Sequence, residues 1–183
     1  MRIRVETIPD EGLSFSYEEQ AETFPVLKEM SQSGECKFIA PVTIRLKAIR
    51  VRDMIEVVGQ FHTVVRLTCS RCLNEYEAPL KSRFSLTYVR ELPASRDAAA
   101  KNEIEIGEDD VGLIHFVGEH IDLRDGIQEQ VVLAFPMRLL CSGQCKGLCV
   151  QCGADLNKGD CGCRPERSGS GFSALKDVKV RQK

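Results

Sequence analysis

The sequence predicts an α+β fold, built from a mainly antiparallel β-sheet, one or two helices and a C-terminal Cys-rich segment. Three observations lead to this prediction. Apolar and polar residues alternate over several stretches between residues 41 and 89, one later stretch has apolar residues at helical spacing, and six of the nine cysteines lie within residues 141–163. The chain of 183 residues, 43% hydrophobic and 28% charged, is long enough for one domain with its own core and a small appendage.

The sheet is predicted from four consecutive stretches with strand periodicity. In PVTIRLKAI (41–49), Val42, Ile44 and Leu46 would share one face of a strand, and polar or basic residues lie between them. Charged or Gly-containing turns separate this stretch from the others, which are residues 54–59, 61–69 and 83–89. Because the links are short, we expect consecutive strands to pair antiparallel, with one face of the sheet exposed to water.

The remaining elements complete a β-rich domain over residues 1–140. Residues 91–110 lack periodicity and are expected to form a loop, followed by a short strand near 112–117. In IDLRDGIQEQVVLAFP, Asp122 is positioned to cap a helix near 122–134, and Pro136 ends it. Residues 16–30 also have helical composition, but Pro25 interrupts it, so we expect only a short, broken helix there.

The expected cellular compartment determines how the cysteines are interpreted. No apolar run reaches the ~20 residues that cross a bilayer, and the N-terminal MRIRVETIPDEGLSF lacks the apolar stretch of a secretory signal. We therefore expect a cytoplasmic protein without a membrane partner. In a reducing cytoplasm, clustered cysteines are more often metal ligands than disulfides.

The Cys-rich segment, residues 141–163, contains one candidate metal site within itself. Cys149-Val-Gln-Cys152-Gly153 has the form of a zinc knuckle, in which two thiolates at a turn are followed by a glycine that can adopt positive φ. Cys161 and Cys163 follow shortly afterwards and can complete a tetrahedral site. Because the intervening turn-rich residues could hardly bury a core, the metal would provide one.

A second CxxC motif, Cys69-Ser-Arg-Cys72, lies at the end of a predicted strand. Pairing it with Cys141 and Cys145 gives another four-cysteine site, which would join the sheet to the chain that leaves the helix. Four thiolates leave no open position, so we expect two structural Zn²⁺ ions rather than catalytic ones. Cys36 is left over and is expected to be a half-buried strand residue without a ligand role.

Other interpretations of the cysteines stay open at this point. The distal site can slide along the cluster to Cys145, Cys149, Cys152 and Cys161. Cys145, Cys149 and Cys152 also have the CxxxCxxC spacing with which radical S-adenosylmethionine enzymes hold an iron–sulfur cluster, although only 31 residues follow Cys152. The sequence contains no phosphate-binding loop, no zinc-protease motif and no nucleophile elbow, so we expect no enzymatic activity.

Charge is segregated along the chain. The formal net charge is −2, but residues 37–90 carry ten basic and four acidic residues, and the tail at 164–183 carries six basic and two acidic ones. Such regions are candidates for binding a polyanion. The candidate RNA-binding residues are Arg45, Lys47, Arg50, Arg66, Arg71, Lys81, Arg83, Lys176 and Lys179. The acidic run at 103–110 is a candidate contact for a basic protein, and the tail is expected to be flexible.

Several motifs follow one another in a specific order. CSRCL (69–73) precedes an acidic loop, then come IDL-x2-GIQEQVVLAFP, C-x3-CKGLC-x2-CG-x-DLN-x3-C-x-C and a basic tail containing FSALKDVK (172–179). From about residue 40 to the tail, this order resembles the YceD-type family of large-subunit ribosomal RNA accumulation proteins.

The resemblance implies a function without enzymatic chemistry. Members of such a family would support accumulation of 23S ribosomal RNA and assembly of the large ribosomal subunit, with ribosomal RNA or a large-subunit precursor particle as partner. An adaptor that binds a basic ribosomal protein or an assembly factor without touching RNA is the alternative. An iron–sulfur enzyme is the remaining, less favoured interpretation.

Overall fold

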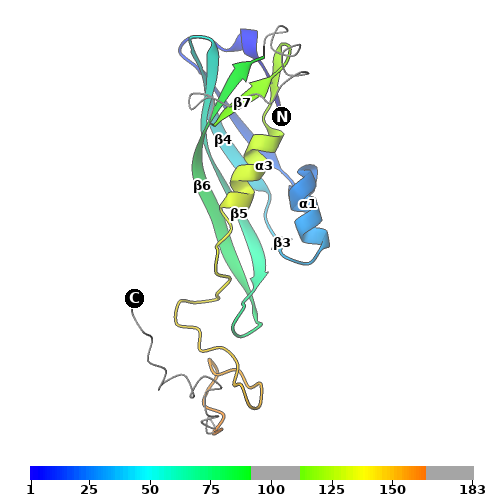
Figure 1. The fold of residues 1–183 in the computed structure, drawn as a ribbon, viewed down its shortest axis with the longest axis vertical. Coiled ribbons are helices and arrows are strands. Elements are labelled where there is room, and N and C mark those ends of the chain that lie inside the picture. The colour runs from blue at the N-terminus through cyan, green and yellow to red at the C-terminus, as the bar shows by residue number, and fades with distance from the viewer. Residues whose placement is uncertain (92–111, 164–183) are drawn as a thin grey trace, which may run out of the picture.

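A six-stranded sheet forms the body of the computed structural model, which describes residues 1–91 and 112–163. The strand order is β2-β4-β5-β6-β7, and β3 pairs with the end of β5 (Figure 1). All pairs are antiparallel except β6 with β7, which is parallel. The prediction of a mainly antiparallel sheet is therefore confirmed. The strands are β2 (Leu13–Glu19), β3 (Lys37–Phe38), β4 (Val42–Val51), β5 (Met54–Thr68), β6 (Glu75–Arg90) and β7 (Leu113–Phe116).

Two α-helices in the described residues, α1 (Pro25–Gln32) and α3 (Arg124–Leu133), cover one face of this sheet (Figure 1). The buried positions of β4 and β5 alternate, and their side chains pack with Leu27 of α1 and Ile127 of α3 in one hydrophobic core. The Gln128 side chain accepts a hydrogen bond from the Val26 N–H over 2.8 Å and links the helices. The opposite face of the sheet, called here the open face, carries the other residues of each strand, among them the exposed Arg45, Lys47, Gln60, His62, Lys81 and Arg83. In the described ranges, no helix is long and apolar enough to cross a membrane.

A two-stranded sheet ties the N-terminus to the start of α3. Strand β1 (Arg2–Arg4) pairs antiparallel with β8 (His120–Asp122), and the Leu123 N–H donates to the Met1 carbonyl over 2.9 Å. Nothing in the periodicity of either short strand predicts this pairing, because its partners lie far apart in the chain.

The central hairpin is longer than its periodicity predicts. Residues 54–59 and 61–69 were expected as separate strands, but β5 continues through Gly59. A Cβ atom at Gly59 would lie 2.7 Å from the Phe84 ring, so this glycine provides room for an aromatic side chain rather than a turn. Strand β6 starts at Glu75, well before the predicted start at residue 83. Pro79 is tolerated because β7 pairs only with residues 87–90, which leaves β6 an edge strand at this point.

The predicted helices also need correction at their starts. Asp122 lies in β8, and α3 begins at Arg124, yet Asp122 Oδ1 accepts the Arg124 N–H over 3.1 Å. The broken helix expected over 16–30 is wrong. Residues 16–19 belong to β2, and Pro25 begins α1 instead of interrupting it, because a missing N–H costs nothing in the first helical turn.

Candidate metal centres

Eight cysteines form two groups of four, and within each group all Sγ atoms lie within 4.8 Å of one another. The proximal centre consists of Cys69, Cys72, Cys141 and Cys145, and the distal centre of Cys149, Cys152, Cys161 and Cys163. These are the two sets that the sequence spacing favoured, and the sliding set that mixes Cys145 with the distal cysteines does not occur. Cys36 is buried immediately before β3, not within a strand, and belongs to neither group.

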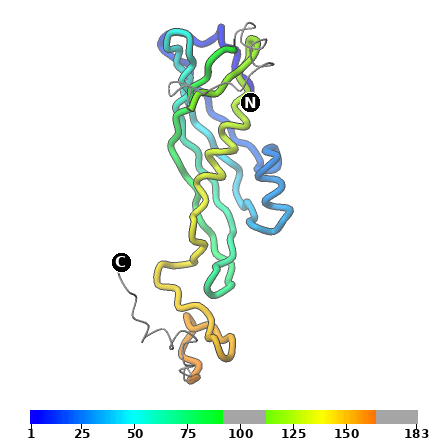
Figure 2. The backbone as a smooth tube through the Cα atoms, viewed as in Figure 1, coloured from blue at the N-terminus to red at the C-terminus, as the bar shows by residue number. Residues whose placement is uncertain are grey.

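The proximal centre joins the β5–β6 hairpin to the chain that follows α3 (Figure 2). Its Sγ atoms lie 3.8 Å apart for Cys69 and Cys145, and 3.7 Å apart for Cys72 and Cys141. A tetrahedron with Zn–S bonds of about 2.3 Å has edges of about 3.8 Å. These two distances match the edges of such a tetrahedron, and the other sulfur atoms of the centre lie within 4.8 Å of one another, so the geometry suits a four-thiolate zinc site.

The two CxxC turns have the same backbone hydrogen bonds. The Leu73 N–H donates to the Cys69 carbonyl, and the Gly153 N–H to the Cys149 carbonyl, both over 2.9 Å. The residue after each motif is left-handed, with φ of 58° at Leu73 and 73° at Gly153. The first motif is thus a knuckle like the second. Leu73 takes the left-handed position that a glycine, Gly153, occupies in the second motif.

Backbone amides favour the thiolate form of the first cysteine in each knuckle. The Cys72 N–H lowers the pKa of Cys69 to about 6, and the Cys152 N–H lowers the pKa of Cys149 to about 6. Hydrogen bonding with the neighbouring thiols Cys145 and Cys152 raises the pKa values of Cys141 and Cys163, respectively, to about 12. The four cysteines of one group can therefore all be thiolates only if a cation neutralises them. An all-sulfur ligand set suits a soft or borderline cation such as Zn²⁺. Burial raises the pKa of the isolated Cys36 to about 11, which favours an inert thiol.

A polar network connects the loop of the distal centre with the proximal centre. Asp155 accepts a hydrogen bond from the Asn74 side chain over 2.7 Å and from the Asn157 side chain over 2.8 Å. Asn157 Nδ2 also lies 3.4 Å from Cys145 Sγ, and Asn157 Oδ1 accepts the Lys146 N–H over 2.8 Å. The DLN motif at 155–157 belongs to the order of motifs in the sequence, but its spacing alone assigns it no role. The structure shows that it orients a ligand cysteine and the hairpin tip.

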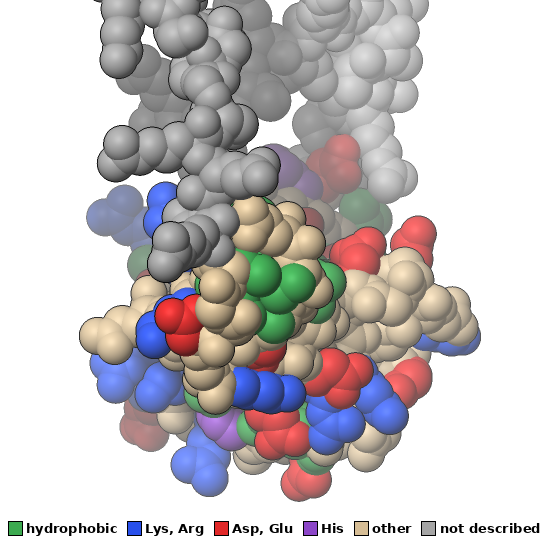
Figure 3. Space-filling model, turned by 90° about the horizontal axis from the view of Figure 1, so that it is seen from below, with side chains coloured by type: hydrophobic (Ala, Val, Ile, Leu, Met, Phe, Trp, Pro, Cys, Tyr) green, Lys and Arg blue, Asp and Glu red, His purple; other side chains and the backbone are tan. Residues whose placement is uncertain are grey.

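Three of the predicted RNA-binding residues are engaged within the protein. Arg50 donates to the Val5 carbonyl over 2.7 Å, and Arg71 donates to the Cys145 carbonyl over 2.9 Å. Arg66 forms an ion pair with Glu77 over 3.0 Å. Viewed from the Cys-rich end, acidic and basic side chains are intermixed (Figure 3). This end of the molecule therefore does not carry a uniform positive charge.

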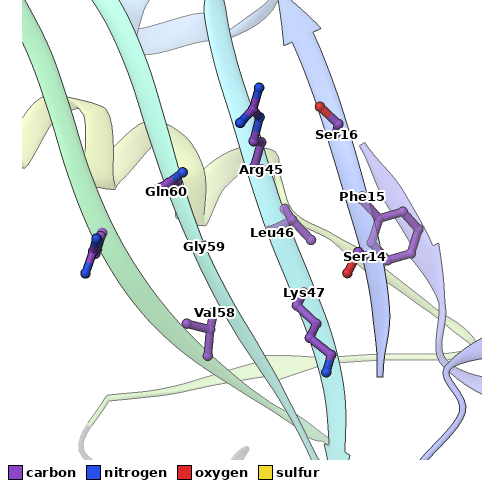
Figure 4. Close-up of a pocket in the computed structure, with 10 residues that line it drawn as sticks. Ser14, Phe15, Ser16, Arg45, Leu46, Lys47, Val58, Gly59 and Gln60 are labelled. Carbon is purple, nitrogen blue, oxygen red and sulfur yellow. The ribbon is translucent and has the colours of Figure 1, made fainter. Parts of the chain in front are cut away.

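The other predicted basic residues of the sheet gather on its open face. Arg45, Lys47, Lys81 and Arg83 are exposed, and within the described ranges none of their side chains takes part in an ion pair or hydrogen bond. Arg45, Lys47, Gln60 and Arg83 line a shallow hollow of about 580 Å³ across β2, β4, β5 and β6 (Figure 4). Lys176, Lys179 and the acidic run 103–110 lie outside the described residues.

Comparison with known proteins identifies the family. The family model "Large ribosomal RNA subunit accumulation protein YceD" matches residues 57–179. The chain belongs to the YceD family. The match contains all eight grouped cysteines and begins within β5, so the YceD region comprises the hairpin, α3 and both candidate metal centres. The resemblance inferred from the order of motifs is confirmed.

Relatives come from plants and bacteria. A "Large ribosomal RNA subunit accumulation protein YCED homolog 1, chloroplastic" of Arabidopsis thaliana is 30% identical over 156 residues, covering 76% of this chain and 49% of the relative. Its counterpart in Zea mays is 31% identical over 159 residues, covering 75% of the chain and 53% of the relative. An uncharacterized protein of Mycobacterium tuberculosis is 37% identical over 111 residues, or 59% of the chain and 49% of the relative. The chain spans about half the length of these relatives. No solved structure matches it.

Proposed function

We propose that this YceD-family chain is a non-enzymatic factor that supports accumulation of 23S ribosomal RNA and assembly of the large ribosomal subunit. The family name supplies the link to ribosomal RNA. The observation that carries the proposal is the open face of the sheet, where four basic side chains lie together without an ion-pair partner among the described residues. Contacts with phosphates through Arg and Lys provide most of the affinity of proteins for RNA of any sequence.

The metal centres have a structural role in this proposal. Each is occupied by one Zn²⁺ held by four thiolates, which leaves no coordination position for water or substrate. Binding of zinc to such sites contributes directly to folding. The proximal ion would hold the hairpin against the segment after α3, and the distal ion would order a loop too small to have a core.

The RNA contact is assigned to a reduced set of residues. Arg45, Lys47, Lys81 and Arg83 belong to it, because none of them forms an ion pair with another described residue. Arg50, Arg66 and Arg71 are left out, since each already binds a group of the protein itself. Lys176 and Lys179 stay in the set as sequence-based candidates in the basic tail.

The first test measures RNA binding by the isolated protein. We expect 23S ribosomal RNA to bind with an affinity that falls steeply as salt increases, and Arg45→Gln/Arg83→Gln to weaken binding at least tenfold. The matched control is Lys28→Gln/Lys158→Gln, which removes the same charge at exposed sites away from the open face. If the parent binds a basic ribosomal protein but no RNA, the adaptor function is correct and this proposal is wrong.

The second test concerns the metal and the cell. Elemental analysis is expected to find two zinc ions per chain, whereas a brown protein with iron and sulfide would favour the iron–sulfur enzyme. In cells that lack the gene, the parent chain should restore the ratio of 23S to 16S ribosomal RNA. The Arg45→Gln/Arg83→Gln variant, expressed at an equal level, should not.

A further inference from the structure

We infer that the open face binds the sugar-phosphate backbone of double-helical RNA rather than the bases of a single strand. This inference rests on the proposed function and specifies the form of RNA that the same face recognises. It depends on the distribution of aromatic, basic and acidic side chains over the two faces of the sheet.

Aromatic side chains of the six-stranded sheet lie on the face that the helices cover. All of them pack in or against the hydrophobic core, and they are Phe15, Tyr17, Phe38, Phe61, Tyr76, Phe84, Tyr88 and Phe116. In the described ranges, the middle of the open face thus has no Phe, Tyr or Trp ring; the partly buried Phe15 lines the hollow from β2, and His62 contributes an imidazole. Proteins that bind single-stranded RNA usually stack its bases on such rings. One imidazole and one ring in the edge strand β2 do not form a row of stacking platforms along the face.

Its exposed side chains instead form cross-strand rows of cations and polar groups. Strand register places Gln60 between Arg45 and Arg83, and His62 between Thr43 and Lys81. Adjacent strands lie about 4.8 Å apart, so Arg45 and Arg83 are separated by roughly 10 Å at the backbone, with an uncharged hydrogen-bonding group between them. Double-helical RNA presents phosphates beside 2′-hydroxyls across a wide, shallow minor groove. Flanking cations and a central amide match that pattern.

Acidic side chains mark the limits of this surface. Glu18 lies opposite Thr43 at the β2 edge, Glu56 accepts a hydrogen bond from Ser85 over 3.1 Å, and Glu77 is paired with Arg66. Glu18 ends the row of Thr43, His62 and Lys81 at the β2 edge, whereas Glu56 and Glu77 lie outside both rows. The backbone-binding surface therefore lies in the middle of β4, β5 and β6, beside the hollow, which extends to β2.

The binding test compares three ligands of equal length: an RNA duplex, an unpaired RNA strand and a DNA duplex of the same sequence. Fluorescence anisotropy is expected to give at least tenfold tighter binding of the RNA duplex than of the single strand. Arg45→Gln/Arg83→Gln should lower the slope of log affinity against log salt by close to 0.9 for each lost phosphate contact. Lys28→Gln/Lys158→Gln should leave that slope unchanged.

Gln60→Ala tests the contact with the 2′-hydroxyl without altering charge. It should weaken binding of the RNA duplex several-fold and leave the weaker binding of the DNA duplex unchanged. Tighter binding of the single strand, or an unchanged salt slope in the double variant, would overturn this inference while leaving ribosomal RNA binding intact. Absence of binding to any RNA would instead refute the proposed function.

Discussion

Asn157 donates a hydrogen bond from Nδ2 to the Sγ atom of Cys145 over 3.4 Å. Asn157 lies in the loop between Cys152 and Cys161, whereas Cys145 belongs to the proximal centre. Asn157 thus lies between ligands of the distal centre in the chain but contacts a ligand of the proximal centre. Hydrogen bonds from such outer groups orient metal ligands and tune their affinity for the metal.

Removal of this contact should weaken the proximal centre specifically. We expect Asn157→Ala to lower the affinity of one of the two zinc ions by about 10- to 100-fold, the usual effect of losing an outer-shell partner. Competition with a chromophoric chelator measures both affinities. Lys158→Ala, in the same loop but without a side-chain contact to a cysteine, is the control. Equal weakening by both variants would mean that general loosening of the loop, not the hydrogen bond, is responsible.

Loss of a ligand should affect the two centres differently. Cys72→Ser opens the centre that joins the hairpin to the segment after α3, so we expect the melting temperature of the sheet to fall by roughly 10 °C or more, which corresponds to about 4 kcal/mol. Cys152→Ser should release one zinc ion and leave the melting of the strands nearly unchanged. Circular dichroism melts and metal content distinguish the variants. Similar losses of stability in both would show that the distal centre also supports the sheet.

Leu73 occupies a left-handed position that suits glycine. The side chain is 63% exposed, so it contributes little burial, and φ of 58° costs a non-glycine residue about 1–2 kcal/mol. Leu73→Gly removes this strain, but a glycine loses more backbone entropy on folding, which offsets part of the gain. We therefore expect the free energy of unfolding to rise by up to about 1 kcal/mol. Leu73→Ala keeps the strain and should give no such gain. Chemical denaturation of the zinc-loaded proteins provides the values, and destabilisation by glycine would indicate that the leucine side chain packs more than its exposure suggests.

The hydroxyl of Tyr88 is buried without a hydrogen-bond partner among the described residues, and its burial raises the Tyr88 pKa. Removing an unsatisfied buried polar atom relieves the cost of its desolvation, which is about 1–3 kcal/mol. We expect Tyr88→Phe to be at least as stable as the parent and to gain about 1 kcal/mol in urea unfolding. Phe84→Tyr, the reverse substitution, adds a hydroxyl on the same covered face and should lower the stability. A marked loss of stability in Tyr88→Phe would mean that an internal water satisfies the hydroxyl.

Asp122 should contribute to stability in an acid-dependent manner. Burial opposes its ionisation, but hydrogen bonds from Arg124 and Arg2 outweigh burial and hold its pKa at about 2. Because the folded pKa is depressed, this stabilisation is complete above the unfolded pKa of about 3.9 and is lost as pH falls toward 2. Asp122→Asn should therefore differ most from the parent above pH 4, and the difference should shrink between pH 4 and 2. Metal loss in acid affects both proteins and cancels in this comparison, so a pH-independent difference would contradict the assignment.

Sequence patterns predicted the parts of the molecule that depend on local periodicity and spacing. Val42, Ile44 and Leu46 are buried as expected, and the two CxxC motifs gather the cysteines that their spacing favoured. Features that depend on distant partners were missed or misread. Gly59 indicated a turn because its actual neighbour, the Phe84 ring, lies in another strand.

The same limitation applies to the candidate site. Arg50, Arg66 and Arg71 are basic residues in a basic region, and only their partners Val5, Glu77 and Cys145 show that they are engaged. Asn157 contacts Cys145 through a side chain whose direction depends on the folding of the whole loop. Parallel pairing of β7 and the pairing of β1 with β8 likewise involve tertiary contacts that no periodicity reports.

The division of the proximal centre between two distant cysteine pairs has a consequence for biosynthesis. A translating ribosome produces Cys69 and Cys72 long before Cys145, and at 5–20 residues per second the intervening chain takes about 4–15 s to make. The hairpin can form during this interval, but its ligand set is still incomplete. Zinc acquisition at the proximal centre must therefore come late in synthesis, and the nascent chain carries two reduced, unprotected thiols until α3 and the residues beyond it have emerged.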